Sequence, residues 1–132
     1  MLPALLVPKP KTVPWRNPHL LDMGKPCLFR LPGVCNRNPE TTVAAHSNLS
    51  IHGKAGARKA DDCYSAWACS SCHTWFDAGP SPAEHKAEWF MVAHADQVLE
   101  WRRIAMDQTA DRKDRASAIA ALTRLDCWPA VE

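Results

Sequence analysis

Two pairs of cysteines constrain the fold of this 132-residue chain more than any other feature of its sequence. Cys27 and Cys35 flank a Leu-Pro-Gly-Val turn, Cys69 and Cys72 form a Cys-x-x-Cys pair, and 33 residues separate the two pairs. Two close thiol pairs are typical of a structural site in which four thiolates hold Zn²⁺ tetrahedrally. We therefore expect a metal to join two segments that lie far apart in the sequence.

The six cysteines could instead form three disulfide bonds if the protein were secreted. The apolar stretch at residues 1–8 is short, broken by proline and preceded by no basic residue, so it predicts neither a signal peptide nor a membrane span. We expect a cytoplasmic protein without a membrane partner. Thiols stay reduced in that compartment, which favours metal binding over disulfides.

The composition fits one small domain without an overall basic character. The formal net charge is +2, so any binding of nucleic acid must rest on a local group of basic residues. A chain of this size buries only about two-thirds of its unfolded surface. A bound zinc ion would therefore add stability that the small core does not supply.

The predicted elements divide the chain into three parts. Residues 1–24 hold five prolines before residue 19 and no regular period, which predicts an extended arm ordered only around Trp15 and Arg16. Residues 25–80 are expected to form the zinc-bound core. Residues 81–132 are expected to form a helical extension.

The core pattern predicts two short strands and a helix, an α+β arrangement. β-Branched residues favour a strand at 41–46 that ends in His46, and a second strand is expected at 63–68. The glycine-containing segment 47–62 between them predicts a long loop. Residues 70–77 predict a short helix directly after the second strand.

Capping residues and apolar periodicity predict the helical extension. The Ser-Pro-Ala-Glu sequence at 81–84 forms a capping box with proline at the first helical position, so a long helix should begin there. A final helix is expected at 111–125. The predicted buried positions are Phe90, His94, Val98, Trp101 and Ile104 in the long helix, and Ile119, Leu122 and Leu125 in the final one.

His73 directly follows the second thiol pair, and three interpretations of this motif are open. Cys-x-x-Cys-His is also the sequence of the motif that attaches haem covalently, and such haem proteins require export and a distal ligand to the iron. In a plain zinc knuckle, His73 would be a surface residue. In a nuclease helix, His73 and Asp77 would share one face, because they lie four residues apart, and would point toward a divalent ion.

His46 and Asp62 are the candidates for proton transfer. A neutral imidazole at a strand end could take a proton from the water that attacks a phosphodiester; the alternative is a half-buried structural histidine. Asp62 could hydrogen-bond His46 or the loop, bind metal, or serve as a turn residue. Asp77→Asn is expected to weaken the metal dependence markedly, and Asp61→Asn is expected to change it little.

Lys54, Arg58 and Lys59 form a local basic cluster on the glycine-containing loop. Such side chains could hold the backbone phosphates of DNA, and the alternative is a solvated loop. Four further residues are expected only to pack or to lie at the surface: Cys63, Cys127, His85 and His94.

Three stretches of the sequence resemble the small HNH-type endonucleases of phages and prophages, the YbcO type of ββα-metal or His-Me finger nucleases. They are residues 26–46, which end in Val-Ala-Ala-His, residues 59–62, and residues 68–73. The resemblance covers about residues 16–79 and is specific there. It implies a zinc-braced ββα-metal core, which the long helix and a short C-terminal helix would follow.

The resemblance also implies roles for individual residues. His46 would be the general base, and His73 would bind a catalytic Mg²⁺, Mn²⁺ or Zn²⁺. The structural Zn²⁺ would be bound by Cys27, Cys35, Cys69 and Cys72.

The chain departs from the superfamily at one position. An acidic or histidine metal ligand usually precedes the base, and this chain has Ala45 there. Asp77, Asp62 or water would then complete the metal site. Asp62 or Asn48 would stand in for the middle asparagine of the motif.

The expected function is therefore metal-dependent endonucleolytic cleavage of DNA in phage or prophage DNA metabolism, inside a bacterial host cell. Phage or host recombination and replication proteins are candidate partners. The alternative is a zinc-ribbon module that binds nucleic acid or protein without cutting, which includes an inactive DNA-binding member of the family.

Overall fold

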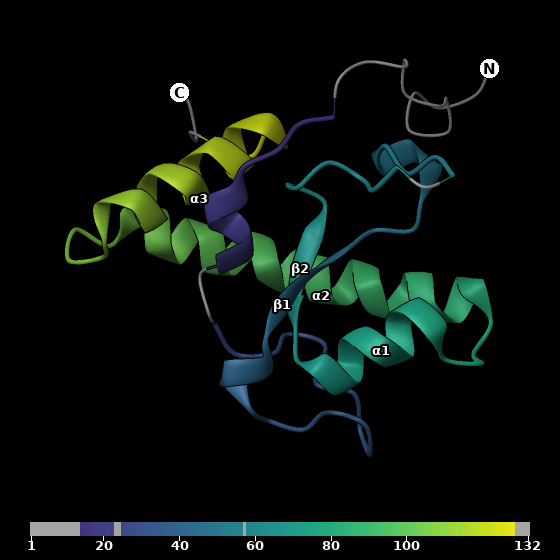
Figure 1. Cartoon of the computed structure of the whole chain (residues 1–132). Helices are drawn as coiled ribbons and strands as arrows, with labels where there is room; N and C mark the ends of the chain where they lie inside the picture. The colour runs from purple at the N-terminus through teal and green to yellow at the C-terminus, as the bar shows by residue number, and fades with distance from the viewer. Residues whose placement is uncertain (1–13, 23–24, 57, 129–132) are drawn as a thin grey trace.

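The computed structural model describes residues 14–22, 25–56 and 58–128. Figure 1 shows the two strands crossing α2, with α3 beside the C-terminal part of that helix and α1 nearer its N-terminal part. The fold is mixed α+β, as the sequence predicts. Its elements are η2 (Pro18–Asp22), η3 (Pro39–Thr41), β1 (Val43–His46), η4 (Ser50–His52), β2 (Ser65–Ala68), α1 (Ser70–Ala78), α2 (Ala83–Met106) and α3 (Arg112–Arg124), in which η marks a 3-10 helix.

The two strands form an antiparallel pair in which Val43 lies opposite Ala68 and His46 opposite Ser65. Both strands were predicted, but each is two residues shorter at its start. The 3-10 turn η3 occupies the residues before β1, and a turn closed by the 2.9 Å bond from Tyr64 N to the carbonyl of Asp61 precedes β2. An isolated two-stranded ribbon is marginal in water, and here the fully buried β2 packs against α2.

A single residue, Cys69, separates the end of β2 from the start of α1, so the chain turns directly from strand to helix. Cys69 is the N-cap, and its sulfur accepts a hydrogen bond from the N–H of Cys72. The predicted order of strand, long loop, strand and helix is confirmed. The loop is more structured than expected, because it contains η4 and a bridge between Ala55 and Arg58.

Helix α2 runs from Ala83, one residue later than the predicted capping box requires. Pro82 is extended and occupies the N-cap position, with no side-chain cap bond, so the predicted role of Ser81 as cap is wrong. The Pro82 carbonyl instead accepts the N–H groups of residues 85 and 86, each at 3.1 Å. On the predicted buried stripe Val98 is only half-buried, and Gln97 is completely buried beside it.

Helix α3 matches the predicted range and is capped by the Asp111 carboxylate, which accepts N–H bonds from residues 113 and 114. The buried face differs from the prediction, because Ile119 and Leu125 are only half-buried. Small side chains allow a close approach of α3 to the protein core. The residues of α3 that are buried are Ser117, Ala118, Ala121 and Leu122.

Residues 14–22 belong to the range 1–24 that was expected to form an extended arm, and this segment packs against the domain. Leu20 is 1% exposed, and η2 lies against α3, where His19 Nε2 is 2.6 Å from Asp114 Oδ1. Residues 1–13 lie outside the described part of the chain. Among the described helices, none combines the length and the apolar character of a membrane span.

Replacement of Gln97 by leucine should destabilise the fold. The Gln97 Oε1 atom accepts the backbone N–H of Trp67 in β2 at 2.9 Å, and its side chain is completely buried. A buried N–H that loses its acceptor costs about 1–3 kcal/mol, and urea denaturation should show a loss in that range. Leu99→Gln, at a site 63% exposed on the same helix, should change stability by less than about 0.5 kcal/mol. An equal loss in both variants would contradict this role of Gln97.

Candidate metal centre and catalytic cleft

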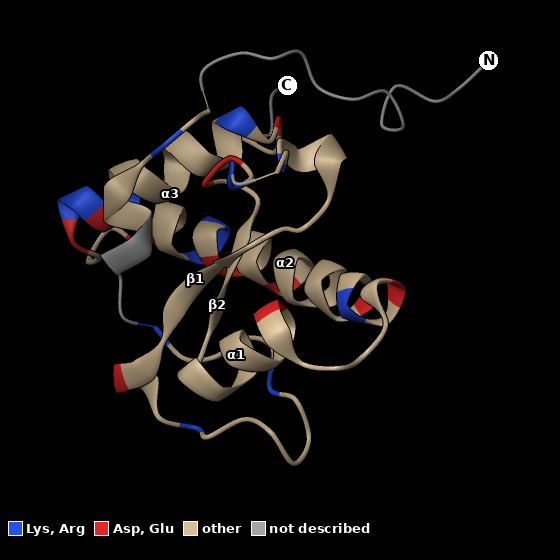
Figure 2. Cartoon of the chain, turned by 45° about the vertical axis from the view of Figure 1, so that its right-hand side comes forward, with Lys and Arg blue, Asp and Glu red and all other residues tan. Residues whose placement is uncertain are grey.

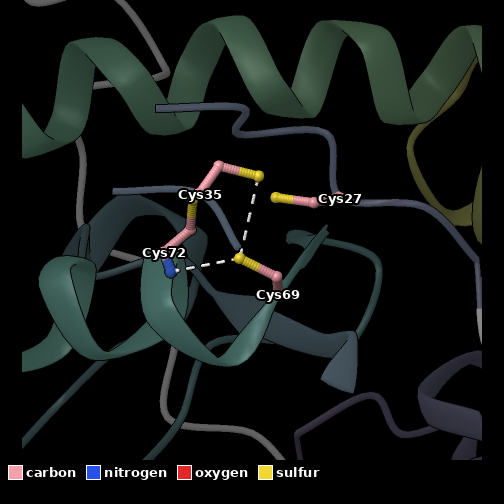
Figure 3. A group of neighbouring side chains, drawn as sticks. All are labelled: Cys27, Cys35, Cys69 and Cys72. Carbon is pink, nitrogen blue, oxygen red and sulfur yellow. Dashed lines mark hydrogen bonds between the residues drawn. The ribbon is translucent and has the colours of Figure 1, made fainter. Parts of the chain in front are cut away.

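Four thiols converge where the loop at residues 27–35 meets the start of α1 (Figure 3). The four sulfur atoms all lie within 4.8 Å of one another, and those of Cys35 and Cys69 are 3.9 Å apart. Thiolates that share a tetrahedral Zn²⁺ at about 2.3 Å lie about 3.8 Å from each other. The spacing therefore fits four ligands of one such ion, and the four cysteines form no disulfides with each other.

Backbone N–H groups are directed at these sulfurs. Arg30 N donates to Cys27 Sγ, and the N–H groups of Asn36 and Cys72 donate to Cys69 Sγ, each at 3.4 Å. Arg30 adopts a left-handed backbone with φ of 48°, which costs free energy in a residue other than glycine. The three N–H groups that donate to the sulfur atoms favour the thiolate form of the cysteines over the thiol.

The thiols differ in how readily they ionise. Burial raises the pKa of both Cys72 and Cys35. Burial acts in the same direction on Cys69, but the N–H groups of Cys72 and Asn36 outweigh it and lower the Cys69 pKa to about 7. Cys69 is thus close to ionisation at neutral pH, and binding of a cation among the thiols would release the protons of the others.

His46 lies at the end of β1 and is held there by Asp62. Its Nε2 atom is 2.8 Å from Asp62 Oδ1, and the two side chains are 12% and 2% exposed. Because the carboxylate accepts this hydrogen bond, Nε2 carries a proton, and in the neutral ring the lone pair is on Nδ1. Of the roles open to Asp62 from sequence, the structure shows the hydrogen bond to His46.

Asp62 is in turn anchored by the segment before η2. Arg16 Nη1 donates to Asp62 Oδ1 at 3.3 Å, and the N–H of Asn17 donates to Oδ2 at 2.7 Å. The same guanidinium donates to the carbonyls of residues 59 and 60. Burial alone would raise the pKa of Asp62, but hydrogen bonds from His46 and Asn17 and the charges nearby lower it below its ordinary value. Asp62 therefore stays ionised and fixes the His46 ring.

His46 lines a cleft of about 420 Å³ that β1, the loop after it and α1 enclose. His73 and Asp77 line the same cleft from one face of α1, and their Nε2 and Oδ2 atoms are 3.1 Å apart. The structure thus brings together three side chains that the sequence placed on a strand end and on a helix. The other polar lining residues are Ser47, Asn48, Lys54 and Lys59.

His73 and Asp77 offer the cleft an imidazole nitrogen and a carboxylate oxygen, a donor pair that several divalent ions accept. They are 35% and 53% exposed, so water can reach both. Among the described residues, three or more ligand atoms gather within 4.8 Å only at the four cysteines and at His19, Asp111 and Asp114. The cleft therefore holds a close pair of protein donors and leaves room for water and phosphate oxygens.

The basic loop contributes two of its three predicted side chains to the cleft. Lys54 and Lys59 line it, and Arg58 is not among the described residues of its lining. Figure 2 shows basic and acidic residues interspersed along the ribbon. The positive charge of the cleft is therefore a local feature, as the net charge of +2 predicts.

Asp61 has a structural position that the sequence did not indicate. Its side chain is 2% exposed, and Arg124 Nη2 lies 3.5 Å from its Oδ2 atom. The N–H of Trp15 donates to its Oδ1 atom at 3.3 Å. Asp61 joins the N-terminal segment to α3, so its substitution should loosen the fold.

The remaining candidate residues lie away from the cleft. His94 is buried, its Nε2 is 2.8 Å from the carbonyl of Cys63, and burial lowers its pKa, which keeps it neutral at pH 7. His85 is exposed on α2, as predicted. Cys63 is completely buried and Cys127 is exposed.

Sequence reasoning missed the anchoring role of Arg16 and Asn17. They lie 46 and 45 residues from Asp62 in the chain, and an arginine in a proline-rich segment carries no pattern that points to a distant carboxylate. Only the order predicted around Trp15 and Arg16 hinted that this part of the segment has contacts.

Comparisons with known proteins point to one family. Residues 21–117 match the family model described as "Putative nuclease YbcO". Relatives described as "Putative nuclease YbcO" from Escherichia coli (strain K12) and "Putative nuclease ybcO" from Enterobacteria phage 82 are each 47% identical over 55 residues, 41% of this chain and 55% of the relative. The chain spans about half the length of these curated relatives.

A solved structure is also similar. It is described as "Structure of a putative bacteriophage protein from Escherichia coli str. K-12 substr. MG1655". The sequence identity is 34%, the TM-score is 0.48, and the match covers 61% of this chain and 89% of that chain.

Asp62→Asn should remove a pH-dependent part of the stability. Because the Asp62 pKa lies below its ordinary value of 3.8, the ionised carboxylate stabilises the fold above about that pH, and this contribution is lost as the pH falls through the lowered pKa. Urea denaturation should show a larger difference in unfolding free energy between the unsubstituted and the Asp62→Asn protein at pH 7 than at pH 3. Glu88→Gln, at an 80% exposed side chain, should give a small difference at both pH values. A pH-independent difference for Asp62→Asn would contradict the anchoring by charge.

Proposed function

The chain belongs to the family described as "Putative nuclease YbcO", and from this premise we propose that it is an HNH-type, metal-dependent endonuclease that cleaves DNA phosphodiesters. Its relative in a phage supports a role in phage or prophage DNA metabolism, in the cytoplasm of a bacterial host. Phage or host recombination and replication proteins are the proposed partners besides DNA.

One observation carries the proposal: His46, fixed by Asp62, shares a cleft with the His73–Asp77 pair. A binding module has no need for an oriented imidazole opposite a pair of metal-type donors. The antiparallel β1 and β2 followed directly by α1 also support the ββα-metal type, with the base on the first strand and the metal donors on the helix. Two lysines in the same cleft suit a phosphate substrate.

Each of these residues of the cleft has its own role in the proposed hydrolysis. His46 Nδ1 takes a proton from the attacking water, and Asp62 stabilises the imidazolium that results while holding the ring by Nε2. Lys54 and Lys59 hold phosphate oxygens and so orient the backbone. His73 and Asp77 would hold a divalent ion, which supplies charge neutralisation at the phosphate and the leaving oxygen when bound.

We also propose that the four-cysteine cluster binds structural Zn²⁺. The thiol spacing, the N–H donors aimed at the sulfurs and the low pKa of Cys69 all suit a thiolate site. Cys69 and Cys72 face Cys27 and Cys35, which argues against their use as thioether attachments to haem. The site would tie the loop to α1 and so brace the helix that carries His73.

Loss of one cluster thiol should remove zinc and stability together. In Cys69→Ser, elemental analysis should show far less than one zinc per chain, and the thermal midpoint should fall, because metal binding and folding are coupled. Cys127→Ser removes an exposed cysteine outside the cluster and should keep both zinc and the midpoint. A fully zinc-loaded Cys69→Ser protein, or an unsubstituted protein that contains no zinc, would refute the proposed site.

Loss of the base should abolish cleavage without unfolding the protein. His46→Ala should slow the nicking of supercoiled plasmid in Mg²⁺ or Mn²⁺ by about 10²- to 10⁴-fold, the usual effect of a lost general base, with zinc content unchanged. His85→Ala, at an exposed histidine of α2, is the matched control and should cut at the original rate.

In the same assay, Asp77→Asn should need about tenfold or more divalent metal for half-maximal cleavage.

The second candidate function is a zinc-ribbon module that binds DNA or protein without cutting. Ala45 favours it, because this completely buried residue cannot supply the metal ligand usual before the base. Under this alternative the unsubstituted protein would bind DNA but nick no plasmid in any divalent metal. Undiminished nicking by His46→Ala would place the base elsewhere in the chain.

A further inference from the structure

A second, smaller cavity opens beside the cleft, between the end of α1 and the start of α2. Its volume is about 220 Å³. Half of its ten lining residues are apolar, and they include Leu49 from the loop, Phe76 from α1, and Ala83 and Ala87 from α2, whereas the other half are polar or charged. The Lys86 ammonium donates to the carbonyl of Gly79 at 2.6 Å and ties the two helices together across this point.

The cavity adjoins the cleft, because Ser47, Asn48 and Asp77 line both. A group bound in the cavity would therefore be a neighbour of a phosphate bound against Asp77 in the cleft. No step of the proposed hydrolysis uses the apolar walls. The cavity thus offers contacts to a part of the substrate other than its reacting phosphate.

The size and the lining indicate which part of the substrate fits. A cavity of about 150 Å³ holds a benzene ring, so about 220 Å³ admits one nucleobase and excludes a base pair. Phe76 and Phe90 lie among the lining residues, each is 1% exposed, and their rings stack on each other with centroids 5.6 Å apart. Apolar walls suit the faces of a base. Asn48 and Ser81 supply polar groups for its edge.

We propose that this cavity binds the base of a nucleotide next to the cleaved phosphodiester, so that the preferred substrate is DNA with an unpaired nucleotide at that position. The inference rests on the proposed endonuclease function. A paired base is stacked inside the duplex and cannot enter a pocket beside its own backbone. Turning it out costs free energy, which is smallest where the nucleotide is already unpaired.

The test compares three synthetic DNA substrates of one sequence: a full duplex, a duplex with one unpaired nucleotide, and the same duplex with that nucleotide abasic. Cleavage of the second should exceed that of the other two about tenfold in kcat/KM, the order expected from stacking of one base. Ala87→Phe and Ala83→Phe, which fill the cavity from two positions of α2, should reduce this advantage to less than about twofold. Ala95→Phe, at an exposed site outside both cavities, should keep it.

Fluorescence anisotropy of the same three DNAs measures their binding to the His46→Ala protein. This second readout needs no cleavage. An affinity that depends on the base and is lost on adding Ala87→Phe supports the pocket, even if no nicking occurs and the endonuclease proposal fails. Cleavage and binding that are equal with and without the base overturn the pocket while leaving the endonuclease proposal intact. The pocket is also overturned if both Ala87→Phe and Ala83→Phe keep the preference for the unpaired base while circular dichroism shows that they are folded.

Discussion

The convergence of four thiols is the contact on which the arrangement of this small domain depends. It joins the loop at residues 27–35 to the first turn of α1, two segments that no strand pairing connects. Helix α1 carries His73 and Asp77, so the cluster sets where these side chains stand relative to β1 and His46. Arg30, whose backbone is left-handed, also directs its N–H group at Cys27 of the cluster.

A second network, centred on a buried carboxylate, fixes the other half of the cleft. Asp62 receives hydrogen bonds from His46, Arg16 and the backbone of Asn17, which satisfies both of its oxygens. A buried charge is tolerated only with such partners. The orientation of the proposed base therefore depends on a segment that lies before the core in the chain. Neighbouring Asp61 joins that segment to α3 by its contacts with Trp15 and Arg124.

These two networks meet at a surface with two chemical characters. Most residues that line the cleft beside His46 are polar or charged, and two of them are lysines, whereas half of the residues that line the adjoining cavity are apolar. Such a junction suits a nucleotide, which has a charged backbone and a flat, mostly apolar base. Helix α2 supplies both core packing and a wall of this cavity, so the proposed substrate site includes part of the helical extension.

The sequence by itself determined the features that depend on near neighbours in the chain. Backbone periodicity acts over three or four residues. It accounts for the two strands and the three helices, for the spacing of the Cys-x-x-Cys pair, and for the one-turn spacing of His73 and Asp77. The capping by Ser81 failed because Pro82 is extended and itself occupies the cap position. Only the tertiary structure decided that Asp62 pairs with His46, that Arg16 holds Asp62, and that Gln97 rather than Val98 is completely buried. These contacts join residues 16 to 46 positions apart, and packing selects such pairs from many chemically equivalent ones without leaving a pattern in the sequence.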